Sequence, residues 1–161
     1  MKKKVSELTA EEFQKTFPIT LEEYNPDYAE WYETERQQIL QVVNTQEVVR
    51  INHIGSTAVE GLVAKPIVDI LLEMDGCCNV TKLLERLRTL GFGVEISTRR
   101  DDPLRLLLGK GMSCDGYADK VFLLHVRYVG NWSELYFRDY LRAHPDVAVQ
   151  YGQLKRNILR D

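Results

Sequence analysis

The residues whose types could do chemistry gather between positions 53 and 73. Gly55, Ser56 and Thr57 follow a β-branched run that predicts a strand over residues 47–54. Glycine lets backbone N–H groups approach a ligand closely, and the two hydroxyls add donors. Such a turn suits a phosphate group, particularly where a short helix begins at the hydroxyl residues. A strand-to-helix turn whose hydroxyls only cap the helix needs no ligand, and it is the alternative interpretation.

A lysine and an aspartate follow the turn. Lys65 precedes Pro66, which favours an extended lysine at the head of a second strand predicted over residues 66–74. That strand is almost wholly apolar, as in a strand buried on both faces, and Asp69 therefore stands out. A carboxylate in such a run needs a partner, a metal ion or hydrogen bonds. We expect Lys65 to bind phosphate and Asp69 to act as a metal ligand or general base; a solvated lysine and a structural ion pair are the alternatives.

Four later side chains complete the candidate site. His125 and Arg127 share one face of a strand predicted over residues 121–129. The histidine could bind a metal ion or move a proton near neutral pH, although a hydrogen-bonded core histidine is equally compatible with the sequence. Arg138 and Arg142 lie one helical turn apart, and their guanidinium groups could each donate two hydrogen bonds to a phosphate. A surface ion pair with a neighbouring aspartate is the alternative for these arginines.

Composition narrows the class of protein. The 161 residues, 44% hydrophobic and 28% charged, are typical of one soluble domain. The formal net charge of −3 provides no basic field for nucleic acid, so we expect a small phosphate-bearing partner instead. About eighteen consecutive apolar residues, which a membrane helix needs, occur nowhere, and no apolar run follows the basic N-terminus. The three cysteines form no disulfide framework or zinc spacing, which predicts reduced thiols in a cytoplasmic protein.

The periodicity of apolar residues predicts a mixed sheet covered by helices, an α/β (α+β) fold. Besides the strands given above, we expect an edge strand over 19–24, strands over 92–98 and 104–108, a turn over 99–103 and a loop over 109–119. Helices are expected over 9–17, 26–43, 79–90, 131–143 and 146–159, with Asn79 and Asn131 as N-caps.

Residues 53–70 resemble the signature of the GrpB family, a group of small bacterial proteins assigned by fold to the nucleotidyltransferase superfamily and sometimes fused to dephospho-CoA kinase. Later stretches resemble the same family in the same order: 124–126, 137–145, Tyr151 and 154–156. The resemblance implies a single nucleotidyltransferase-like domain over 1–161, with an N-terminal extension over 1–18. The family commonly has a further helical segment, so the resemblance also leaves open a truncated C-terminal part.

The resemblance implies a magnesium site, but the sequence departs from the superfamily pattern. That pattern is a Gly-Ser turn, a spacer, and two acids on one strand that hold magnesium. Twelve residues separate Ser56 from Asp69, which fits the spacer, yet Leu71 occupies the place of the second acid. Glu73 lies about 13 Å from Asp69 along a strand that rises about 3.3 Å per residue, too far to share one ion with it. A two-metal centre is therefore disfavoured.

Two functions from different classes remain open. The first is a magnesium-dependent nucleotidyltransferase that binds a nucleotide at Gly55 and Ser56, with the metal on Asp69. The second is a non-catalytic module that binds or scaffolds a nucleotide or another phosphate-bearing small molecule. Convergence of Asp69 with His125 would favour the enzyme, whereas an arginine paired with Asp69 would favour the module. The fold alone does not decide between them.

Overall fold

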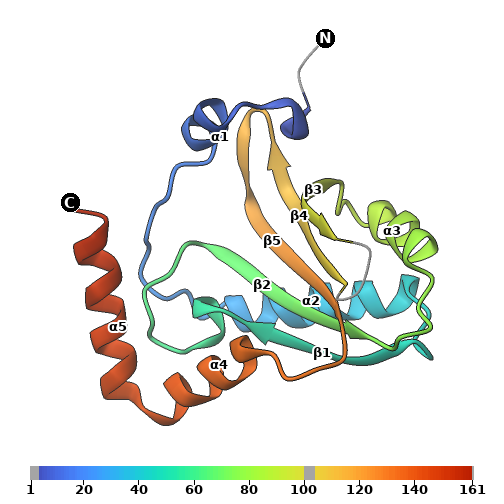
Figure 1. Cartoon of the computed structure of the whole chain (residues 1–161). Helices are drawn as coiled ribbons and strands as arrows, with labels where there is room; N and C mark the ends of the chain where they lie inside the picture. The colour runs from blue at the N-terminus through green and yellow to red at the C-terminus, as the bar shows by residue number, and fades with distance from the viewer. Residues whose placement is uncertain (1–3, 100–103, 161) are drawn as a thin grey trace.

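The computed structural model describes residues 4–99 and 104–160, which form one five-stranded sheet with helices around it (Figure 1). The strand order is β1-β2-β5-β4-β3. β2 and β5 are parallel, and every other neighbouring pair is antiparallel. The predicted mixed sheet covered by helices is confirmed. The strands are β1 (Val48–Ile54), β2 (Ile67–Met74), β3 (Val94–Arg99), β4 (Arg105–Ser113) and β5 (Gly116–Tyr128).

In the described residues, five α-helices and two 3-10 turns lie around the sheet. α2 and α3 pack on one face, whereas α4 lies beside β1 and leads into α5 (Figure 1). No helix in the described ranges is long and apolar enough to cross a membrane. The helices are α1 (Ala10–Thr16), α2 (Tyr28–Val42), α3 (Val80–Thr89), α4 (Ser133–Ala143) and α5 (Pro145–Ile158), and the 3-10 turns are η1 (Val5–Glu7) and η2 (Ser56–Ala58).

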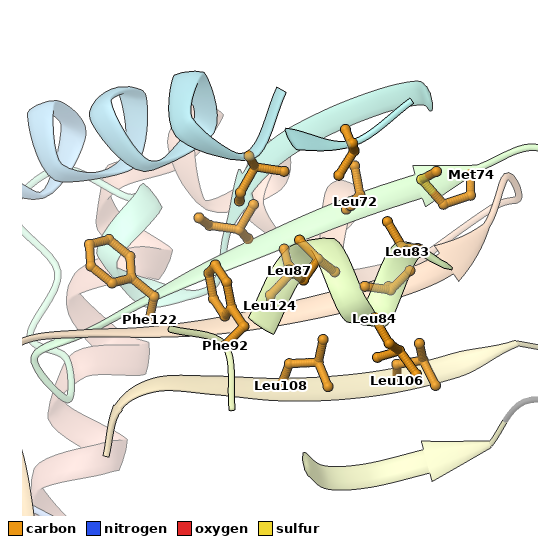
Figure 2. Packing of buried hydrophobic residues seen from close by; sticks show 14 of the residues in the cluster. Leu72, Met74, Leu83, Leu84, Leu87, Phe92, Leu106, Leu108, Phe122 and Leu124 are labelled. Atoms are coloured by element: carbon orange, nitrogen blue, oxygen red, sulfur yellow. The ribbon is translucent and has the colours of Figure 1, made fainter. Parts of the chain in front are cut away.

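The core lies between the sheet and the helices α2 and α3 (Figure 2). Alternate residues of β2, including Leu72 and Met74, point into it and meet Leu83 and Leu87 of α3. The intervening residues of β2 must then face the opposite side of the sheet. Asp69 is one of them. Although β2 is buried almost throughout, its alternation of side chains places this carboxylate on the face of the sheet away from the core.

The predicted helix starts at Thr9 and Asn79 are confirmed. The Thr9 hydroxyl accepts a hydrogen bond from the Glu12 N–H at 3.2 Å, and the Glu12 carboxylate accepts one from the Thr9 N–H at 2.9 Å, which is a complete capping box. The Asn79 side chain accepts a hydrogen bond from the Lys82 N–H at 3.0 Å. The predicted cap at Asn131 is wrong, because α4 begins after Trp132 and has no side-chain cap.

Two other predictions of local structure are wrong, and one falls outside the described residues. Residues 19–24 form no strand; Glu22 makes one isolated bridge with Ala64. Residues 109–119 are a β-hairpin rather than a loop, because β4 and β5 pair as far as Ser113 and Gly116. The predicted turn over 99–103 overlaps the end of β3 at residue 99, and its residues 100–103 lie outside the described ranges.

Candidate functional site

The 55–57 turn, which consists of Gly55, Ser56 and Thr57, lies directly beside Asp69. β1 and β2 are antiparallel neighbours with Ile54 opposite Asp69, so the end of β1 meets the start of β2. Gly55 has a φ of +75°, and a Cβ placed on it would lie 2.8 Å from Asp69 Oδ2. A side chain at this position would therefore be strained by the backbone and would collide with the carboxylate. The glycine allows the turn to approach Asp69, and η2 then begins at Ser56.

Asp69 and His125 converge on the face of the sheet that points away from the core. β5 runs parallel to β2, and it places His125 beside Leu71, one pleat from Asp69. The His125 Nε2 and Asp69 Oδ1 atoms are 2.9 Å apart. The two side chains remain 20% and 26% exposed, and of the two only Asp69 is among the described residues that line a cavity. An ionised carboxylate only accepts hydrogen bonds, so when a neutral imidazole pairs with ionised Asp69 the Nε2 atom donates and Nδ1 is the acceptor.

A cavity of about 460 Å³ opens in front of Asp69. This volume falls in the range of small-molecule sites. We call it the Asp69 cavity. Its apolar walls include Leu107 and Leu123 of the sheet. The polar and aromatic side chains that line it include Ser56, Thr57, Lys65, Asp69, Tyr151 and Lys155.

Lys155, from α5, also lines the cavity, although its sequence neighbourhood did not mark it as a candidate site residue. Its Nζ donates a hydrogen bond to Ser56 Oγ at 2.8 Å and another to the Val63 carbonyl. Burial, together with a smaller effect of the Lys65 charge, lowers the pKa of the Lys155 amine to about 8. Its place in the stretch 154–156, which resembles the GrpB family, was the one signal that could have pointed to it.

Comparison with known proteins identifies the family. A family model described as GrpB protein matches residues 18–161. The chain belongs to the GrpB family. A solved structure described as the crystal structure of conserved protein GrpB from Enterococcus faecalis is similar, with a TM-score of 0.73 and 30% identity over 88% of this chain and 83% of that one. The family resemblance and the mixed α/β architecture expected from the sequence are thus confirmed.

Two relatives set the extent of the similarity. The glutamate-rich protein GrpB of Alkalihalophilus pseudofirmus is 34% identical over 126 residues, which are 76% of this chain and 71% of that protein. The UPF0157 protein YqkA of Bacillus subtilis is 31% identical over 138 residues, which are 84% of this chain. The match covers 38% of the Bacillus protein, so this chain spans less than half of that relative.

Arg127 of this GrpB-family chain lies on the same face as His125 but binds a helix. Its Nη2 donates to Glu134 Oε1 at 2.6 Å, and its guanidinium lies 4.6 Å from the centre of the Trp132 ring. Burial by itself would raise the pKa of the Glu134 carboxyl, but the hydrogen bond and charge of Arg127 bring it below its ordinary value. Arg127 thus holds the start of α4 against β5, and it is absent from the described lining of the Asp69 cavity.

Arg138 and Arg142 also lie outside the Asp69 cavity as far as its described lining shows. Arg138 Nη1 donates to the His53 carbonyl at 3.0 Å, and Arg142 Nε donates to the Ala58 carbonyl at 2.8 Å. Both arginines therefore tie α4 to the chain on either side of the 55–57 turn. The surface pair expected as the alternative forms at Arg138, whose Nε donates to Asp139 Oδ1 at 2.8 Å.

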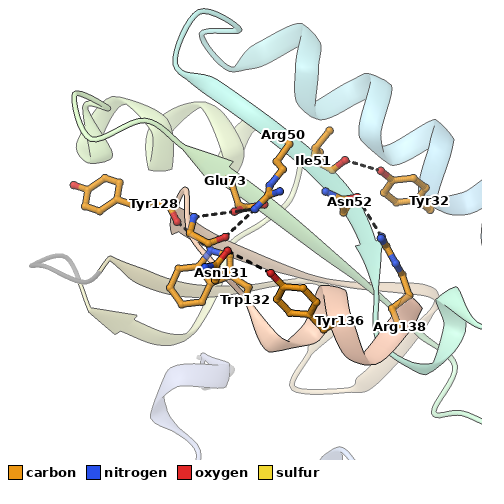
Figure 3. A network of polar contacts seen from close by, with 11 residues as sticks. Tyr32, Arg50, Ile51, Asn52, Glu73, Tyr128, Asn131, Trp132, Tyr136 and Arg138 are labelled. Carbon is orange, nitrogen blue, oxygen red and sulfur yellow. Dashed lines mark hydrogen bonds and ion pairs between the residues drawn. The ribbon is translucent and has the colours of Figure 1, made fainter. Parts of the chain in front are cut away.

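The acids of β2 limit any metal site. Glu73 is fully buried and accepts hydrogen bonds from Arg50 Nη2 at 3.0 Å and from the Gly130 N–H at 3.2 Å (Figure 3). Arg50 Nε also binds this carboxylate. Leu71 is buried without any exposed surface. Within residues 4–99 and 104–160, no three His, Cys, Asp or Glu side chains form a group that could hold a metal ion. A metal ion near Asp69 would need most of its ligands from a bound molecule or from water.

A second cavity of about 660 Å³ lies on the other side of the 55–57 turn, and we call it the Arg142 cavity. His53 lines it, stacks on Tyr32 with ring centres 4.9 Å apart, and contacts Thr57 Oγ1 through Nε2 at 2.9 Å. Burial lowers the pKa of His53 to about 4, and the charges of Arg142 and Arg138 contribute in the same direction. His53 is consequently neutral at physiological pH and supports the turn from behind.

Proposed function

We propose that this chain binds a nucleotide or another phosphate-bearing small molecule in the Asp69 cavity. The observation that carries the proposal is that Ser56, Lys65 and Asp69, all from the 53–73 stretch, line one cavity of ligand size together with Lys155 of α5. The hydroxyl and the ammonium group are donors that suit phosphate oxygens. Lys65 is exposed, and its side chain makes no hydrogen bond or ion pair with any residue of the described ranges, so its charge is available to a ligand.

Magnesium is proposed to enter this site together with the ligand. Asp69 is the one carboxylate in the described lining of the cavity. Magnesium commonly binds through one or two carboxylates and completes its shell with substrate phosphates and water. The ion would neutralise phosphate charge beside Asp69. We also propose that the fold is related to that of the nucleotidyltransferases. A cytoplasmic location is proposed as well, because it suits the free thiols of Cys77, Cys78 and Cys114.

Isothermal titration with ATP, GTP, CTP and UTP, each with and without magnesium, tests the proposal. We expect at least one nucleotide to bind, and more tightly with magnesium. Asp69→Ala should remove the gain due to magnesium and strengthen metal-free binding, because the carboxylate repels a bare phosphate. Glu85→Ala, which removes an exposed carboxylate of α3 on the opposite face of the sheet from Asp69, is the matched control. Absence of binding by all four nucleotides would contradict the nucleotide form of the proposal, and inorganic phosphate would then test the broader form.

The Asp69–His125 contact favours a second candidate function, transfer of a nucleotidyl or phosphoryl group. The acceptor hydroxyl oxygen would bond to phosphorus while its proton passes to His125 Nδ1, and the leaving phosphate oxygen would take the electron pair of the broken P–O bond. Asp69 would hold the imidazole in the tautomer that accepts this proton, with its Nε2 at 2.9 Å.

Phosphorus NMR of ATP incubated with the protein and magnesium tests the transfer candidate, with water or glycerol as the acceptor. Release of phosphate or pyrophosphate that is lost in His125→Gln, with ATP affinity unchanged, is the expected result for an enzyme. Intact ATP in the presence of demonstrated binding would favour the non-catalytic module instead.

A further inference from the structure

Lys155 reaches the 55–57 turn because α5 packs unusually closely against the chain that follows the turn. A Cβ placed on Gly152 would lie 3.2 Å from Val63 Cγ1 and 3.4 Å from Leu62 Cδ1, so even one methyl group would press on this segment. Lys155 is three residues further along and therefore on the same side of the helix. Its Nζ donates to Ser56 Oγ at 2.8 Å and to the Val63 carbonyl. The helix thus delivers a third cationic or polar donor to the site, beside Ser56 and Lys65.

The two lysines give the cavity an excess of positive charge. Lys65 and Lys155 line the same cavity, and the positive charge of Lys65 contributes to the lowered pKa of the Lys155 amine. Across the described parts of the chain, no carboxylate lies within ion-pair distance of either amine. Asp69 lines the same cavity, but its carboxylate contacts His125. Two like charges that share one cavity, with Lys155 partly buried there, are unfavourable unless an anion compensates them.

We propose that Lys155 and Lys65 bind one terminal phosphate group together, which makes the site selective for doubly charged phosphate monoesters over singly charged phosphodiesters. The inference rests on the proposed function and narrows its ligand class. A terminal phosphate carries nearly two negative charges at neutral pH, one for each ammonium group. A phosphodiester carries one charge and leaves the second lysine without a counter-ion. The site would therefore accept a free nucleotide or phosphorylated metabolite and disfavour the backbone of a nucleic acid.

The test compares adenosine 5′-monophosphate with the methyl ester of its phosphate group, a phosphodiester that has the same base and ribose but one negative charge fewer. Titrations at pH 7.5 and low salt should show the monophosphate bound at least about tenfold more tightly by the unaltered protein, as expected when one charge-assisted contact is lost. Lys155→Met and Lys65→Met should reduce this ratio to within about threefold. Lys155→Arg should keep most of it, and Lys82→Met, on the remote helix α3, should leave it unchanged.

Two results separate the inference from the function on which it rests. If both compounds bind the unaltered protein equally, or if Lys155→Met retains the full ratio, the two-lysine clamp is wrong although the phosphate site stands. If neither these compounds nor ATP binds, the proposed nucleotide function fails as well. If Lys155→Met does not fold, Lys65→Met still provides the test. The Lys65 side chain is exposed and makes no hydrogen bond to any described residue, so its replacement should not disturb the fold.

Discussion

Replacement of Gly55 by alanine should both destabilise the protein and distort its site. The φ of +75° with ψ of −173° belongs to a region that only glycine adopts readily, so the backbone contributes about 1–3 kcal/mol of destabilisation. The new Cβ would lie 2.8 Å from Asp69 Oδ2 and 3.3 Å from Asp69 Cγ. Crowding of this kind adds about 1–3 kcal/mol. For a chain of 161 residues the melting temperature should fall by roughly 4–24 °C.

A neighbouring glycine provides the control for this prediction. Gly61 has the same φ of +75°, but nothing lies within 4 Å of the position of its Cβ. Gly61→Ala should therefore cost only the backbone strain, about 1–2 kcal/mol. Urea unfolding followed by circular dichroism measures both variants, alone and combined with Asp69→Ala.

The double-mutant cycle isolates the contact between the turn and Asp69. Asp69→Ala removes the carboxylate but keeps the Asp69 Cβ, 3.3 Å from the new methyl group, so it should remove most of the crowding cost of Gly55→Ala while leaving the cost of Gly61→Ala unchanged. If Gly55→Ala costs no more than Gly61→Ala, or costs the same with and without the carboxylate, the close approach of turn and carboxylate is refuted.

Three further predictions concern the scaffold. Arg50→Met should destabilise the protein by about 3 kcal/mol, because it leaves the fully buried Glu73 carboxylate without its ion-pair partner. Urea unfolding measures this loss, and the double variant Arg50→Met/Glu73→Met should recover most of it. Asn79→Ala should cost about 1 kcal/mol through loss of the α3 cap, a thermal shift that Lys82→Ala at the same helix end should not reproduce. His53 has a pKa of about 4 in the folded protein and 6.5 as its ordinary value. The unfolded state therefore takes up the proton first as pH falls, so the contribution of His53 is complete above about pH 6.5 and is lost toward pH 4, by up to about 3 kcal/mol. Urea midpoints measured across this range should fall less steeply in His53→Gln, and an equal slope in both proteins would contradict burial of a neutral imidazole.

The central strands and the candidate carboxylate could be predicted because their signals are local. The apolar run of β2 marks a strand buried on both faces, and Asp69 is conspicuous as the one acid in its first half. The glycine turn before it could also be located, although the reason for Gly55 lies in space rather than in sequence, since Asp69 occupies the volume that a Cβ would take.

The errors arose where tertiary contacts decide the structure. Residues 109–119 resemble a loop because glycines interrupt the alternation, yet Gly111 has a φ of +80° and its Cβ would lie 2.2 Å from the Lys120 carbonyl oxygen. That glycine is a bulge inside a paired hairpin, where the ladder shifts register. Lys155 could not be assigned to the site from its own neighbourhood, because its partner Ser56 is 99 positions away.

Sequence spacing placed Arg138 and Arg142 relative to each other but did not show which groups they contact. Sequence spacing correctly puts Arg138 and Arg142 one turn apart on a helix, but both bind backbone carbonyls around the turn. A forked donor suits a carbonyl as well as a phosphate, so residue type alone did not distinguish support of the turn from contact with a ligand.

The measurement that tests the central claim most directly is a titration of the isotopically labelled protein with magnesium ATP, followed by the backbone amide resonances. We predict shifts at Ser56, Lys65, Asp69 and Lys155, which line the Asp69 cavity. Thr57 is excluded as a reporter because it lines both cavities. Shifts that cluster instead around Arg142 in the second cavity, or no shifts at millimolar ATP, would contradict a nucleotide site beside Asp69.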